Sequence, residues 1–284
     1  MLAQSRRGFT LVELLIALVL MGIVAASIYQ LLVSNQRIYR QQTQRVELND
    51  NIRSAIAILP GELRELNASD PLGSDIIAMS DSAITYKVTR NLYFVCQNVG
   101  NSAELYVDTA TVGLRGLDPN TDSLLIFADS LTTRRTDDRW IHANLIRVES
   151  GNNCPGGRPS LKLTFLPAVL VSDSVIAGAP VRGFEVVEAR KYRDANGALW
   201  LGSRRWNKST GWGTIQPLVG PLEGAGLRFA FFDANGAATT NRAQVARVSI
   251  TVIGRTAEPV QLSTGGIGHL VDSLVTHVAL RNNR

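Results

Sequence analysis

The chain has 284 residues, of which 45% are hydrophobic and 19% are charged, as expected for a globular domain. Its formal net charge of +5 is too small to indicate nucleic-acid binding by itself. The length allows an anchor helix followed by one large domain or two small ones.

The first predicted element is a membrane segment that begins within the stretch Arg6-Arg7-Gly8-Phe9-Thr10-Leu11-Val12-Glu13. From Phe9 to Val33 the chain contains one acidic residue, Glu13, and no basic residue. A helix needs about 20 mainly apolar residues to cross the hydrocarbon core, so residues 9–33 are long enough to span. A carboxylate inside such a segment is costly, which makes Glu13 a candidate functional residue.

Two simpler interpretations of this stretch are an ordinary membrane anchor and a secretory signal peptide. A secretory signal has small residues at its cleavage site, and Ala25-Ala26-Ser27 could serve as one. Neither interpretation accounts for Glu13.

The residues Gly8-Phe9-Thr10-Leu11-Val12-Glu13-Leu14 resemble the class III leader junction of type IV pilins and type II secretion pseudopilins. The resemblance implies a leader of residues 1–8, cut between Gly8 and Phe9 by a prepilin peptidase, and N-methylation of Phe9. It also implies that residues 9–33 stay as the membrane anchor. The family often has a proline where this chain has Gln30, so a helix break there is not expected.

The resemblance gives Glu13 a role in subunit assembly. Cleavage leaves an amine on Phe9 whose unperturbed pKa is about 8. In a filament core this cation would be desolvated and would need a carboxylate partner. Glu13 of a neighbouring subunit could supply it and set the axial stagger between subunits.

The second half of the helix is amphipathic. Between Ile52 and Leu66, apolar residues recur at steps of four and three, which is one face of a helix. We therefore predict a single helix over residues 9–66, with residues 34–66 laid on a sheet. Pro60-Gly61 should kink this helix or end it early.

Residues 67–284 predict a β-rich globular domain, so the fold class is α+β, with a long helix on a mostly antiparallel sheet. Strand patterns cover residues 83–89, 91–96, 124–128, 141–148, 161–165, 181–192, 198–206, 227–232, 245–253 and 270–280. The tetrapeptide Asp-Ala-Asn-Gly at residues 194–197 predicts a tight hairpin turn, and it recurs at residues 233–236. Residues 257–268 predict a flexible loop.

The second half of the chain also resembles the larger minor pilins of the W type and the J-type minor pseudopilins. The matching features are an Asp-x-x-Gly turn, the strand Arg-Val-Ser-Ile-Thr-Val and the terminal Val-Ala-Leu-Arg-Asn-Asn. The resemblance implies a structural subunit that primes or caps a type IV pilus or a type II secretion pseudopilus. Its partners would be the prepilin peptidase and other minor and major pilins or pseudopilins.

The expected location is the inner membrane, with the globular domain in the periplasm and, after assembly, in a filament. Basic residues flank the anchor on both sides, but long domains translocate largely regardless of charge. In that compartment a disulfide between Cys96 and Cys154 is allowed, the alternative being two separate buried thiols.

The short catalytic motifs are absent, so no enzyme, cofactor or metal is expected. Asp118, Asn120, Asp122 and Asp129 have part of the spacing of a calcium loop, but Ser123 replaces its glycine, which favours a turn. The three histidines are scattered along the chain.

A basic cluster surrounds the first Asp-Ala-Asn-Gly turn and is interleaved with aromatic residues. Such a pattern can bind single-stranded nucleic acid, which gives an alternative function as a pilin-anchored binding module for DNA or a surface ligand. The other interpretation is a solvated hairpin whose arginine stems pack on tryptophans. The candidate contacts are Arg190, Lys191, Arg193, Arg204, Arg205 and Trp206.

Overall fold

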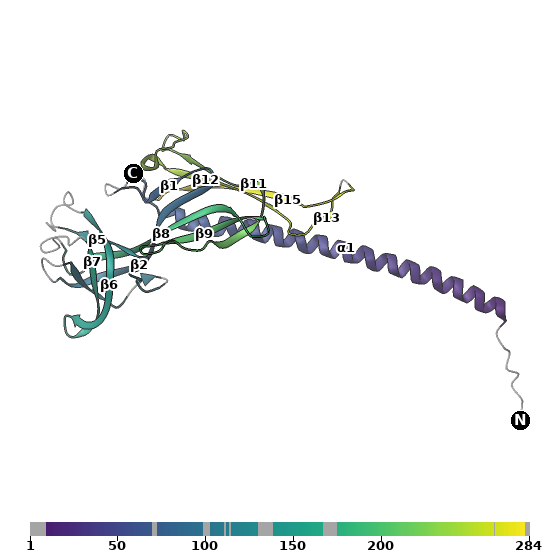
Figure 1. The fold of residues 1–284 in the computed structure, drawn as a ribbon, viewed down its shortest axis with the longest axis horizontal. Helices are drawn as coiled ribbons and strands as arrows, with labels where there is room; N and C mark the ends of the chain where they lie inside the picture. The colour runs from purple at the N-terminus through teal and green to yellow at the C-terminus, as the bar shows by residue number, and fades with distance from the viewer. Residues whose placement is uncertain are drawn as a thin grey trace, which may run out of the picture. The chain divides into compact units, whose positions relative to one another are not determined.

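The computed structural model describes residues 10–69, 73–98, 103–110, 112–113, 115–129, 139–166, 175–263 and 265–281. It confirms the α+β class, with one long helix and antiparallel strands (Figure 1). The chain divides into two compact units. The first comprises Met1–Asp50 and Arg255–Val271, and the second comprises Asn51–Gly254 and Asp272–Arg284.

Helix α1 runs from Leu11 to Arg64, close to the predicted bounds. Pro60 lies inside it, so of the two predicted effects of Pro60-Gly61, a kink or an early end, the early end is wrong. Proline removes one backbone donor, a small loss only one turn before the end of the helix. The last carbonyl is satisfied from elsewhere in the chain, because the Arg281 N–H donates to the Arg64 oxygen at 2.9 Å.

Strands overlap every segment that the alternating pattern predicted. Their bounds are β1 Ile76–Met79, β2 Ala83–Asn98, β3 Glu104–Asp108, β4 Val112–Gly113, β5 Ser123–Ala128, β6 Arg139–Cys154, β7 Arg158–Leu166, β8 Pro180–Arg193, β9 Leu199–Asn207, β10 Gly211–Trp212, β11 Gln216–Phe232, β12 Arg247–Arg255, β13 Val260–Gln261, β14 Ile267–Gly268 and β15 Val271–Ala279, and a 3-10 turn covers Arg242–Gln244.

The two predicted strands on either side of Arg90 form one strand, β2, with a bulge. Thr89 pairs with Phe184 and Asn91 pairs with Gly183, which leaves Arg90 as the extra residue. A one-residue bulge exchanges the two faces of a strand. This is why the buried side chains of β2 change from even to odd positions across Arg90.

One hydrophobic core lies between the C-terminal turns of α1 and a sheet ordered β1-β2-β8-β9-β11-β12-β15. Ala55, Leu59 and Leu63 of the helix belong to it, at the predicted helical spacing. Strands β2 and β8 contribute Ile84, Tyr86, Val187 and Ala189.

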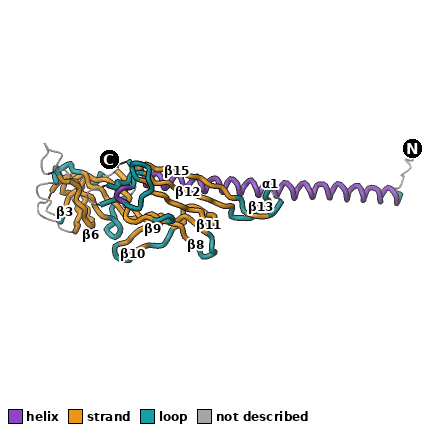
Figure 2. The backbone as a smooth tube through the Cα atoms, turned by 90° about the horizontal axis from the view of Figure 1, so that it is seen from above, coloured by secondary structure: helices purple, strands orange, loops and turns teal. Residues whose placement is uncertain are grey.

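A second core lies inside a ring of strands. Pairing runs from β2 to β3, β7, β6, β5 and β8, and β8 pairs again with β2, so the ring closes. Figure 2 labels three of its strands, β3, β6 and β8. Closure removes free strand edges. The ring encloses buried apolar residues such as Tyr93, Leu124, Leu145, Phe165 and Val181. Strands β2 and β8 therefore take part in both cores.

The two Asp-Ala-Asn-Gly segments form the same turn. The Asp194 carboxylate accepts from the N–H groups of Asn196 and Ala198 at 2.9 Å, and Asp233 repeats this pattern with the residues that follow it. Only the glycine of each turn has a positive φ, +81° at Gly197. The asparagine of each turn has a negative φ. The two-residue turn predicted from Asn-Gly would instead require a positive φ at both residues.

Residues 257–268 contain the short β13–β14 hairpin, so the predicted flexible loop is partly ordered. Side chains of α1 hold it within its own unit. Gln41 donates to the Gln261 carbonyl at 3.2 Å, and Gln44 accepts from the Glu258 N–H at 3.0 Å.

Cys96 and Cys154 are joined in a disulfide, with their Cα atoms 5.4 Å apart. Cys96 lies near the end of β2 and Cys154 at the end of β6, two strands that are not neighbours in the ring. The bond therefore links opposite parts of the ring across β3 and β7.

Candidate functional site

The candidate processing and assembly site lies at the start of α1. Gly8 and Phe9 fall outside the described residues. Thr10 is the first described residue, and its N–H and hydroxyl both donate to the Glu13 carboxylate at 3.0 Å. The Glu13 N–H returns a hydrogen bond to the Thr10 hydroxyl at 3.2 Å. This reciprocal pattern is a capping box, which fixes where the helix begins.

The first half of α1 is apolar and exposed. It is a candidate membrane span by length and composition, and no residue of its most apolar stretch is buried. Leucine, isoleucine and valine side chains from Leu11 to Leu32 are more than half exposed. An apolar patch of this size on a folded protein marks a membrane or a protein-interaction surface.

Residues 4–29 match the family model of the prokaryotic N-terminal methylation motif. The match supports a type IV pilin-like protein. It implies processing by a prepilin peptidase and association with pilins in general. Together with the exposed apolar helix, it suggests a membrane-anchored chain. A search of curated proteins found no match.

Processing of the pilin-like chain is expected to leave N-methyl-Phe9 as the first residue. Intact-mass or N-terminal analysis of membrane-extracted protein measures this directly. Gly8→Val should block the cut, because a branched side chain crowds the backbone at the cleaved bond. A native chain that starts at Met1, or after Ala25, would contradict the assignment of the junction.

The basic hairpin of β8 and β9 distributes its cations over both faces of the sheet. Arg204 of β9 pairs with Glu188 of β8, so these two side chains lie on the same face of the sheet. Arg190 follows Glu188 by two residues and therefore lies on that face as well. Because successive residues of a strand alternate, Lys191 and Arg205 occupy the other face. The sequence cluster therefore does not form one continuous basic surface.

Several of these cations are engaged within the fold. Arg204 hydrogen-bonds Glu188, and its guanidinium lies 4.7 Å from the Trp212 ring. Arg193 donates to the Gly197 carbonyl at 2.9 Å. Trp206 packs edge-on against Trp212 with centroids 5.2 Å apart, and it keeps 39% of its surface exposed.

Lys208, which belongs to the same basic stretch, is held by backbone carbonyls. Its Nζ donates to Pro119 at 3.2 Å, to Leu145 at 2.8 Å and to Asp122. Burial lowers the pKa of Lys208, against the opposing effect of the Asp122 carboxylate. Lys208 thus fixes the turn after β9 to the loop before β5.

The partial calcium spacing belongs to a turn. Asp122 is fully buried, accepts from the Asp118 N–H at 2.8 Å and pairs with Arg115. The Asp118 carboxylate accepts from the Asn120 N–H at 2.9 Å. Within the described ranges, no three His, Cys, Asp or Glu side chains are placed to hold a metal. His142 lies on an exposed position of β6, and partial desolvation, followed by the charges of Lys87 and Lys208, lowers its pKa.

Sequence reasoning missed an ionic network at the junction of the two cores. Its centre is Glu185, whose side chain is fully buried. Glu185 contacts Arg90 at 2.5 Å, Arg115 at 3.0 Å and Arg205 at 3.6 Å. A buried carboxylate requires such compensation. The sequence did contain a signal for Glu185, because this acidic residue interrupts the alternating apolar positions of β8.

The network extends from Glu185 to the helix. Arg90 also donates to Glu62 of α1 at 3.1 Å, and the Tyr86 hydroxyl donates to the same carboxylate at 2.6 Å. Burial is the largest single effect on Arg90 and lowers its pKa, but the hydrogen bonds and charges of Glu185 and Glu62 together outweigh it and raise the pKa of Arg90. Burial and then Glu62 raise the pKa of Tyr86 well above 10.0, so this phenol stays neutral.

Proposed function

We propose that this protein is a minor pilin or minor pseudopilin of the W or J type, a structural subunit that primes or caps filament assembly. The observation that carries the proposal is the methylation motif at the start of a helix that continues into a large β domain. The motif provides membrane insertion and packing into a filament. The domain provides the part that such a subunit would present outside the membrane.

The proposed role is structural and not catalytic. Its working parts are an exposed apolar helix for lateral packing and the Glu13 carboxylate near the helix start. The alternative of a DNA-binding module on the same anchor gains no support from the β8–β9 hairpin, whose cations are divided between two faces.

Deletion of the gene tests the priming role. We expect loss of surface filaments, or of secretion if the system is a type II apparatus, with restoration by a plasmid-borne copy. Filaments are counted by electron microscopy after shearing, and secretion is measured as substrate in the medium. Filament number and secretion that both remain at the wild-type level after deletion would refute the role.

A further inference from the structure

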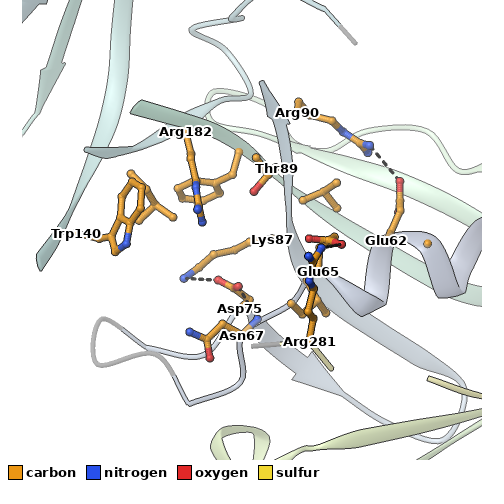
Figure 3. A pocket seen from close by; sticks show the side chains of 15 residues that line it. Glu62, Glu65, Asn67, Asp75, Lys87, Thr89, Arg90, Trp140, Arg182 and Arg281 are labelled. Atoms are coloured by element: carbon orange, nitrogen blue, oxygen red, sulfur yellow. Dashed lines mark hydrogen bonds and ion pairs between the residues drawn. The ribbon is translucent and has the colours of Figure 1, made fainter. Parts of the chain in front are cut away.

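A cleft of about 800 Å³ lies beside the end of α1, next to the outer face of the ring strands (Figure 3). Glu62 and Glu65 line it on the helix side. Trp140 of β6 and Arg182 of β8 line it on the side of the ring. Lys87 of β2 reaches in between them. All of these residues belong to the second compact unit.

Among the residues that the structure describes, the charges that line the cleft are paired except for one. Glu62 pairs with Arg90 at 3.1 Å, and Glu65 pairs with Arg281 at 3.4 Å. Lys87 lies 3.7 Å from Asp75, a distance too long for a hydrogen bond.

Arg182 is the remaining cation, and among the described residues it has no carboxylate within ion-pair distance. Its guanidinium lies 4.5 Å from the centre of the Trp140 ring. Trp140 is in turn placed by Phe127, whose ring packs edge-on against it with centroids 5.3 Å apart. The guanidinium N–H groups that do not face the ring stay available for hydrogen bonds to a carboxylate. Figure 3 shows Arg182 pointing into the cleft beside Trp140.

Lys87 provides a second positive group near the Arg182 guanidinium. Its ammonium lies 5.7 Å from the Phe184 ring, and Figure 3 shows it reaching toward the same space as Arg182. Within the described part of the chain, the cleft thus carries one guanidinium without a carboxylate partner, a weakly paired ammonium and an aromatic wall. This combination favours a ligand with a planar anionic group and a short uncharged body.

We propose that this cleft is a docking site for an acidic segment of a partner protein, bound by a Glu or Asp carboxylate on the donor edge of Arg182. Arginine and tryptophan are the residues most enriched at the energetic centres of protein interfaces. An acidic saccharide fits less well, because Arg182 covers a face of Trp140 on which a sugar ring would stack. The inference does not depend on filament assembly, since binding is measured on the single subunit.

Short peptides test the proposal on the full chain in an uncharged detergent. The probes are the acetylated and amidated peptides Gly-Glu-Gly-Glu-Gly and Gly-Gln-Gly-Gln-Gly. The readout is the indole N–H signal of Trp140 in protein labelled with ¹⁵N-tryptophan. The chain has four tryptophans, so the Trp140→Phe variant assigns the signal. The glutamate peptide should give a saturable shift, weaker at high salt, and the glutamine peptide should give none.

Variants locate the contact. Arg182→Gln should weaken binding by about 10-fold or more, because a charge-assisted hydrogen bond is lost. Arg182→Lys keeps the charge but not the fork, and binding should also weaken. Arg228→Gln is the matched control, since Arg228 is an exposed arginine of β11 outside the cleft lining. It should leave binding unchanged.

Four results would overturn the proposal. The first is an equal shift with both peptides, and the second is no shift with either peptide. The third is undiminished peptide binding by an Arg182→Gln variant that keeps the wild-type melting temperature. The fourth is a response to tetragalacturonate at lower concentration than to the glutamate peptide, which would assign the cleft to an acidic glycan instead.

Discussion

Glu13→Ala is expected to reduce incorporation into filaments by at least about 100-fold, while the chain remains folded, cleaved and inserted. In the proposed assembly, Glu13 neutralises the Phe9 amine of a neighbouring subunit, and its loss leaves a desolvated cation. Insertion should be kept, because the variant removes the acid from the apolar segment. Folding should be unaffected, because the first buried side chain of α1 is Leu48. The measurement compares sheared filaments with membrane fractions by immunoblot.

The capping box supplies the control for Glu13. Glutamine at this position can still accept the hydrogen bonds from Thr10 but carries no charge. If the charge pair matters, Glu13→Gln should fail like Glu13→Ala, and if only the helix start matters, Glu13→Gln should assemble normally. A subunit at the filament tip has no neighbour above it, so normal assembly of both variants would argue for a tip position or against the charge pair.

Glu185→Gln is expected to lower the free energy of unfolding of the domain by about 3 to 5 kcal/mol. The carboxylate is fully buried, and its loss leaves Arg90 and Arg115 without their shared counter-charge. Urea unfolding of the full chain in detergent, followed by tryptophan fluorescence, measures the change.

Two comparisons make the Glu185 result interpretable. Glu149→Gln removes a carboxylate that is 43% exposed and pairs with exposed Arg147, and it should cost less than about 1 kcal/mol. Arg115→Met combined with Glu185→Gln should cost less than the sum of the single changes, because both act on one network. Equal small effects of Glu185→Gln and Glu149→Gln would contradict a central role for Glu185.

Local patterns predicted the elements well and their partners poorly. The bounds of α1 lie within two residues of the expectation at each end, because the capping box and the apolar stripe are local signals. The pairing of β2 with β8 depends on residues about 95 positions apart, which no local pattern encodes. Arg90 looked like a boundary between strands because a bulge changes the apolar parity there, and Glu185, its buried partner, lies far along the chain.

The functional stretch shows the same division. The junction at Gly8 and Phe9 and the role of Glu13 are predictions from sequence alone, because their chemistry is contained in a few consecutive residues, and residues 4–29 match the methylation motif. The cleft of Arg182 and Trp140 could not be predicted, because it joins the end of a helix with four strands distant in sequence. The arrangement of the basic hairpin could not be predicted for a related reason, since neighbouring positions in a strand point to opposite faces.

The sharing of β2 and β8 by both cores constrains the order in which this domain folds. Neither core can be completed until Thr89 meets Phe184, so one long-range encounter precedes both. Pairings of this kind form slowly, because the chain loses the entropy of closing a long loop before the stabilising contacts are made. A chain that has not yet made this pairing therefore has exposed strand edges, and during that interval proteolysis and aggregation compete with folding. An anchored helix holds each chain at the membrane during that interval and keeps the unfinished domains apart in space.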